Sequence, residues 1–109
     1  MREIKFRFLD LELRKMCYRN PLTYDFCTPK SIVPMQYIGL KDKDGNDIYE
    51  GDILEFPFEM GIAFVISDGF RFAVESPGSG AIDYESEYVI KTTTIIGNIY
   101  ENPELVSYF

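Results

Sequence analysis

Short apolar runs that alternate with polar residues, and that end at glycine, proline or aspartate, are the feature that most constrains the fold of this chain. At the start, apolar Ile4, Phe6 and Phe8 alternate with charged residues that include Lys5 and Arg7. A period of two residues is typical of a strand that buries one face. We therefore expect the three apolar side chains to face the core and the charged ones to face solvent. No long stretch shows the period of a helix.

Turn residues divide the chain into further strands. Asp10 interrupts the first alternating run, which predicts a hairpin around residues 9–13. A loop is expected over residues 19–34, where Asn-Pro and Thr-Pro pairs are turn signals. Asp44-Gly45 predicts a tight turn between apolar segments, since glycine readily adopts positive φ.

The second half of the chain shows the same punctuation. Residues 53–56 read as a short strand that Pro57 ends. Residues 62–66 and 70–74 form the clearest predicted hairpin, because Asp68-Gly69 between them is a strong two-residue turn signal. Residues 92–96 are rich in β-branched side chains and predict another strand.

The predicted fold is mainly β. We expect one domain over residues 1–109, built as a small antiparallel sheet or a partly open SH3-like barrel. A short C-terminal helix is expected to follow, with Asn102 as its N-cap and Pro103 at its first position.

Charge is unevenly distributed along the sequence. The net charge is −7, yet the first 20 residues contain six Lys or Arg and three Asp or Glu. An acidic surface disfavours nucleic acid, because phosphate contacts need clustered cations. The simplest interpretation is solubility; the alternative is a basic edge, with Lys5, Arg7, Arg14 and Lys15, that meets an acidic patch on a partner or a second copy.

Few residue types in the chain suit catalysis or metal binding. Histidine is absent, which excludes histidine acid-base chemistry and histidine ligands. Cys17 and Cys27 could pair, but reduced thiols are the more frequent state in a non-secreted chain, and two thiolates cannot complete a zinc site. The segment 42–47 lacks the spacing of a calcium loop and reads as a solvated hairpin turn. We expect no cofactor and no metal.

The segment Glu50-Gly51-Asp52 precedes a short apolar strand and suits a tight corner of a barrel. Asp52 could accept backbone N–H bonds there and fix the bend. The alternative is a paired-carboxylate site with an acidic residue of segment 83–87, namely Asp83, Glu85 or Glu87. We take Glu50 and Asp52, together with the four cations of the basic edge, as the candidate interaction residues.

Several blocks together resemble the YopX family of small phage and prophage proteins. These blocks are Arg2 to Arg7, Arg14 to Met16, Met35 to Gly45, Ile48 to Ile53, and Ile96 to Leu105. At Phe8-Leu9 the chain departs from the Ala-Trp pair that is more frequent in the family. The resemblance implies a phage-derived origin and a location in the bacterial host cytoplasm, and it favours oligomerisation. It implies no activity, substrate or catalytic residue.

Three function classes follow. The first is a non-catalytic protein-interaction module that self-associates or binds a host or phage protein. The second is a nucleic-acid-related role, by contact through the basic N-terminal hairpin or by acidic mimicry of DNA. The third and least favoured is an enzyme with a carboxylate-based site. We expect no membrane association, because no apolar run approaches the roughly 18 residues of a membrane span.

Overall fold

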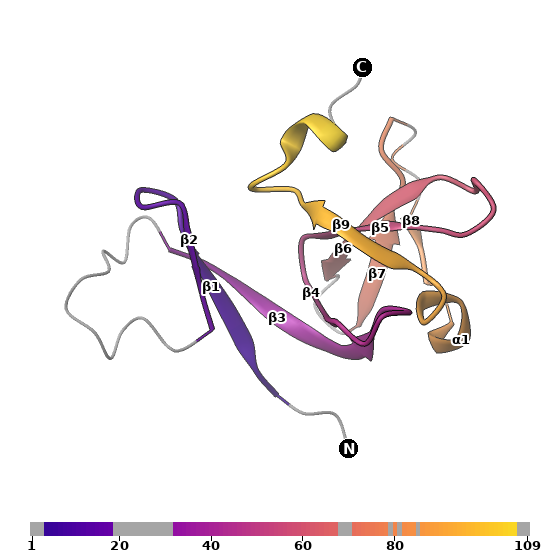
Figure 1. Cartoon of the computed structure of the whole chain (residues 1–109), viewed down its shortest axis with the longest axis horizontal. Coiled ribbons are helices and arrows are strands. Elements are labelled where there is room, and N and C mark those ends of the chain that lie inside the picture. The colour runs from indigo at the N-terminus through magenta and orange to yellow at the C-terminus, as the bar shows by residue number, and fades with distance from the viewer. Residues whose placement is uncertain are drawn as a thin grey trace.

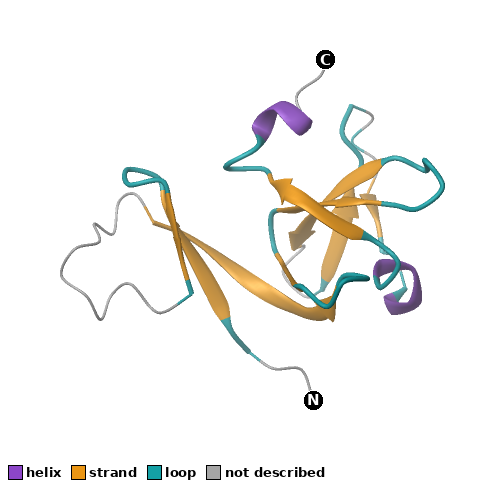
Figure 2. Ribbon diagram, viewed as in Figure 1, coloured by secondary structure: helices purple, strands orange, loops and turns teal. Residues whose placement is uncertain are grey.

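Two antiparallel sheets make up the structure (Figures 1 and 2). The computed structural model describes residues 4–18, 32–67, 71–78, 80, 82–84 and 86–106. Within these residues one sheet has the strand order β2-β1-β3-β4 and the other the order β8-β7-β6-β5-β9, which curls into a half-barrel. The predicted mainly β class is confirmed.

Apart from β3, which has ten residues, the elements are short, as the frequent turn residues predict. The first sheet contains β1 (Phe6–Asp10), β2 (Lys15–Cys17), β3 (Ile32–Lys41) and β4 (Asp47–Tyr49). The second contains β5 (Asp52–Glu55), β6 (Ile62–Ser67), β7 (Phe72–Glu75), β8 (Ile82–Asp83) and β9 (Thr94–Asn98). One helical turn, α1 (Glu87–Ile90), and a 3-10 helix at Pro103–Leu105 complete the described elements. No helix among them is long and apolar enough to span a membrane.

Strand β3 connects the two parts of the molecule. Its first half pairs with β1, from Gln36 opposite Phe6 to Ile32 opposite Asp10, and its second half pairs with β4. We call β1, β2 and the first half of β3 the arm, because Figure 1 shows them extending away from the half-barrel. The register shifts between Tyr37 and Lys41, so the strand is irregular where it passes from one part to the other.

Two predicted hairpins are confirmed. Strands β1 and β2 pair across a turn in which Asp10 Oδ1 accepts hydrogen bonds from the backbone N–H groups of Glu12 (3.0 Å) and Leu13 (3.1 Å). This is the Asx-type turn that an aspartate at a strand end favours. Strands β6 and β7 also pair antiparallel, while their turn at residues 68–70 lies outside the described residues.

The predicted orientation of the first strand is wrong. Ile4 and Phe6 are exposed (78% and 40%), whereas Arg7 and Leu9 are buried. Leu9 occupies the inner face because it packs with Met35 on the neighbouring strand. Arg7 shares that inner face, since its charge is neutralised there by a buried carboxylate, as described below.

Two further details differ from the expectation, and one helix was not predicted. Strand β3 begins at Ile32, so the predicted loop of residues 19–34 ends earlier; residues 19–31, including Cys27, lie outside the described residues. The predicted short C-terminal helix is present as a single 3-10 turn, with Asn102 at its N-cap position and Pro103 in its first turn. The Asn102 side chain makes no capping bond, and its Oδ1 accepts from the Asn98 N–H instead (3.2 Å). The helix α1, which Ser86 caps, had no sequence signal.

The apolar interior forms two clusters. The half-barrel cluster contains Ile38, Ile48, Leu54, Ala63, Val65, Val74 and Ile90. The arm cluster contains Leu9, Met35, Tyr37 and Tyr49, with Met16 and Val33 against it. Strands β3 and β4 contribute to both clusters with neighbouring residues, Ile38 and Ile48 to the first and Tyr37 and Tyr49 to the second, so their two faces serve the two parts of the molecule.

Asp42 ties the β3–β4 turn to β9. Its Oδ1 accepts from the N–H groups of Asp44 (3.0 Å) and Asn46 (2.9 Å), and its Oδ2 accepts from the N–H of Ile95 (3.1 Å). The hairpin turn is as predicted, with Gly45 at φ +86°, but Asp42 itself is buried rather than solvated. Burial acts to raise the pKa of the Asp42 carboxyl; the hydrogen bonds from Asn46 and Ile95 outweigh it and lower the pKa.

The substitution Asp42→Asn should lower the unfolding free energy by about 1–3 kcal/mol at neutral pH, because buried N–H donors lose a charged acceptor. A lowered pKa in the folded state gives stability that is present above the ordinary value of 3.8 and is lost as the pH falls through the folded value. The gap between wild type and variant should therefore close in acid, as urea denaturation across pH will show.

The control is Asp44→Asn, which changes an exposed carboxylate in the same turn and should alter stability by less than about 0.5 kcal/mol. A gap for Asp42→Asn that stays constant to well below pH 3.8 would contradict the assignment.

Candidate functional site

The corner Glu50-Gly51-Asp52 joins the two sheets. Glu50 exchanges two hydrogen bonds with Gln36 of β3: its N–H donates to the Gln36 carbonyl, and its Oε1 accepts from the Gln36 N–H, both at 2.9 Å. The Gly51 N–H donates to the carbonyl of Val65 on β6, and its carbonyl accepts from the Ile99 N–H, again at 2.9 Å. The chain turns sharply here because Gly51 adopts φ +86°.

Asp52 and Arg7 form a buried ion pair between this corner and the arm. Arg7 Nη2 lies 2.5 Å from Asp52 Oδ1, and the two residues are 6% and 1% exposed. Asp52 Oδ2 accepts from the Tyr49 N–H at 2.8 Å, which is the backbone role predicted for this aspartate. The Arg7 guanidinium also lies over the Tyr49 ring, 4.8 Å from its centroid.

The electrostatics of this pair indicate an architectural role. Burial raises the pKa of the Asp52 carboxyl, although Arg7 and the Tyr49 N–H act in the opposite direction. Arg7 Nε is buried and makes no hydrogen bond to the described residues. A buried pair of this kind regains little more than its desolvation cost, but losing one partner is strongly destabilising. The pair therefore fixes the arm on the half-barrel.

The six predicted interaction residues divide into three groups. Arg7 and Asp52 are interior residues, so the expectation that Arg7 lies on an exposed face is wrong. Glu50 is half-buried and holds Gln36, and Lys5 Nζ lies 2.7 Å from Asp47 Oδ2. Arg14 and Lys15 are exposed near the β1–β2 turn. A role for these residues in contacting a partner stays a prediction.

The carboxylates of the proposed catalytic alternative lie in different environments, some exposed and one buried. Asp83 and Glu87 are exposed on β8 and α1, whereas Asp52 is buried with Arg7; Glu85 lies outside the described residues. In the part of the chain that the structure describes, no three His, Cys, Asp or Glu side chains gather as a metal site would require. The geometry therefore assigns Asp52 to the corner and not to a carboxylate site.

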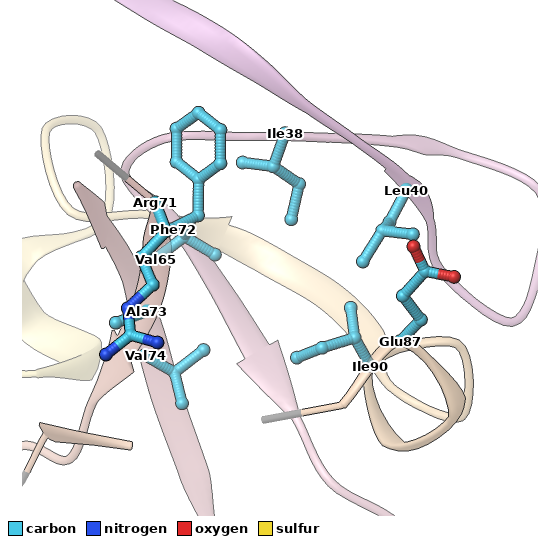
Figure 3. Close-up of a pocket in the computed structure, with 9 residues that line it drawn as sticks. All are labelled: Ile38, Leu40, Val65, Arg71, Phe72, Ala73, Val74, Glu87 and Ile90. Carbon is cyan, nitrogen blue, oxygen red and sulfur yellow. The ribbon is translucent and has the colours of Figure 1, made fainter. Parts of the chain in front are cut away.

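An apolar groove opens at one end of the half-barrel, between β3, β7 and α1 (Figure 3). Its volume is about 140 Å³, and apolar side chains line most of it: Ile38, Leu40, Val65, Phe72, Ala73, Val74 and Ile90. Figure 3 shows the charged side chains of Arg71 and Glu87 on opposite sides of this groove. The Arg71 guanidinium lies 3.5 Å from the centroid of the Tyr84 ring.

A second, more polar cleft of about 480 Å³ lies between the arm and the C-terminal turn. Arg14 lines one part, and Glu101 and Glu104 line another, with Leu9, Leu11, Tyr100 and Pro103 between them. Sequence patterns identify strands that carry part of the groove lining, such as β6 and β7, but not α1. They contain no signal that Leu40, Phe72 and Ile90 meet, because these residues come from three distant elements.

Single substitutions in the buried pair should be costly. Arg7→Met and Asp52→Asn should each lower the unfolding free energy by roughly 3–5 kcal/mol, because each leaves one buried charge unpaired. The double variant should lose much less than the sum, since it removes both charges and leaves neither one buried without its partner. Urea denaturation of wild type, both single variants and the double variant measures the coupling.

Lys5→Met is the matched control, because it removes a half-exposed ion pair that is expected to contribute about 1 kcal/mol or less. Additive losses in the Arg7 and Asp52 variants would show that the two side chains do not act as a pair.

Comparison with known proteins agrees with the architecture. The chain resembles the crystal structure of protein EF1440 from Enterococcus faecalis, with a TM-score of 0.68 and 23% sequence identity over 98% of this chain and 100% of that one. A search among curated proteins found no match. The family model for the YopX protein matches residues 7–107, which include the arm, the corner and the half-barrel. The chain therefore belongs to the YopX family.

Proposed function

We propose that this chain is a non-catalytic protein-interaction module of a phage-derived accessory protein, and that it associates with other copies of itself. The apolar groove of Figure 3 carries the proposal. Leu40 and Phe72 are only partly buried in it, and charged side chains stand at its rim. An apolar centre with a polar rim is the usual anatomy of a protein interface.

Charge favours a second copy as the partner. The chain as a whole carries a net charge of −7, yet exposed Lys43 and Lys91 lie with Leu40 and Glu87 around an adjoining hollow. Arg71 adds a third cation at the groove itself. Opposite potentials on two faces of one protein support association of unlike faces.

The other function classes receive less support. Of the four cations expected to make a basic edge, Arg7 is paired with Asp52 and Lys5 with Asp47, which leaves Arg14 and Lys15 as its exposed cations. Two such residues make a weak phosphate-binding surface. An enzyme would need titratable groups that converge on a pocket, and the apolar groove contains two charged side chains, on opposite sides.

Substitution inside the groove should weaken self-association. Leu40→Arg places a charge among apolar side chains, and Arg71→Glu reverses a charge at the exposed rim; each should raise the dissociation constant at least roughly tenfold. Light scattering after size-exclusion chromatography over a concentration series measures this, and circular dichroism checks that each variant is folded.

Leu13→Arg is the matched control, since Leu13 is an exposed leucine on the arm, away from the groove lining. If this control dissociates the protein while Leu40→Arg does not, the contact surface is the arm and the groove proposal is wrong. A wild type that is monomeric at every concentration would also refute it.

A further inference from the structure

The turn between β5 and β6 has an unusual backbone for its residues. The Met60 N–H donates to the Pro57 carbonyl at 3.3 Å, which closes a tight turn. Both central residues have positive φ, 60° for Phe58 and 58° for Glu59. Hairpin turns with two such residues strongly favour Asn-Gly or Asp-Gly, because other side chains are strained in this conformation.

The side chains of this turn gain no burial in exchange for the strain. Phe58 is 91% exposed and Met60 is 74% exposed. Phenylalanine is a poor residue for a left-handed position and for full exposure to water. Backbone strain and a projecting aromatic ring together are typical of a residue held ready for contact with another molecule.

The groove of Figure 3 matches this turn in size and apolar character. A cavity of about 150 Å³ lined by Leu, Ile and Phe is large enough to bind benzene. The groove has a volume of about 140 Å³, and its lining includes Ile38, Leu40, Phe72 and Ile90. It can therefore receive one phenyl ring.

The charges around the two features are also complementary. Exposed Glu55 and Glu59 flank the projecting ring. The exposed cations Arg71, Lys43 and Lys91 lie around the groove and its adjoining hollow. Among the residues that line these two concavities, Glu87 carries the one exposed carboxylate. Complementary potentials set the orientation in which two surfaces dock.

We infer that Phe58 of one copy inserts into the groove of the next copy, with Glu59 beside Arg71. The inference rests on the proposed self-association and names the segment that fills the groove. Since Phe58 is 91% exposed, it does not occupy the groove of its own chain. The contact joins two different faces of the chain. Two copies that exchange it reciprocally form a two-fold dimer, and copies that pass it on head to tail form a closed ring or an open filament.

Phe58→Asn tests the inference and separates stability from association. Asparagine tolerates positive φ, so the variant should be at least as resistant to urea as wild type. Its self-association should weaken at least roughly tenfold, because the ring that fills the groove is gone. Leu13→Asn, which removes an exposed apolar side chain from the β1–β2 turn of the arm, should leave association unchanged.

Mixing the two kinds of variant gives the sharper result. A Phe58→Asn copy retains its groove, and a Leu40→Arg copy retains its Phe58. Each alone should be monomeric, while their equimolar mixture should form a one-to-one complex and nothing larger, because only one intact pair of ring and groove remains. Sedimentation velocity measures these species.

Two outcomes would overturn the inference. If groove variants dissociate the protein but Phe58→Asn assembles like wild type, the groove binds another segment, and the proposed function stands without this occupant. If Phe58→Asn lowers stability as much as it lowers association, the turn has a structural role. If neither the groove variants nor Phe58→Asn weaken association, the proposed function itself is refuted.

Discussion

The contact between Arg7 and Asp52 is the constraint on which the arrangement of the arm depends. A guanidinium on the second residue of β1 can be buried only if a carboxylate lies at a fixed place, and the corner before β5 supplies it at 2.5 Å. Because the raised pKa of Asp52 shows that burial dominates its electrostatics, the pair contributes position more than net stability. A shift of β1 by one residue against β3 would turn Arg7 to the outer face, away from Asp52, and would expose Leu9 with it.

The corner can hold Asp52 in place because neighbouring backbone groups fix it from several sides. Glu50 is tied to β3, Gly51 to β6, and Asp52 itself to the Tyr49 N–H. Asp42 adds an independent tie, from the β3–β4 turn to Ile95 on β9. In both places an aspartate satisfies backbone donors that the ladders of the two sheets leave unpaired, so acidic residues act here as structural acceptors.

Local patterns predicted the strands and turns but not the face of the first strand. Alternation is symmetric between the two faces, so Ile4, Phe6 and Phe8 suggested an apolar inner face, whereas the inner face is that of Arg7 and Leu9. The decisive partner, Asp52, is 45 residues away in sequence. The same limit applies to the groove, whose lining joins β3, β7 and α1, and no spacing rule connects them.

The Phe58 turn is the opposite case. Its backbone has the two positive φ angles of a common hairpin turn, but its residues are not the Asn, Asp or Gly that this turn favours. An Asn-Gly pair would make the same hairpin with less strain, so the Phe-Glu pair has no advantage for the fold of a single chain. A short turn closed by a backbone hydrogen bond, as between Met60 and Pro57, has less conformational freedom to lose on docking than a long open loop. The turn lies between β5 and β6, and the groove is lined from the second half of β3, from β6, β7 and α1 and by Arg71, so the proposed contact does not use the arm.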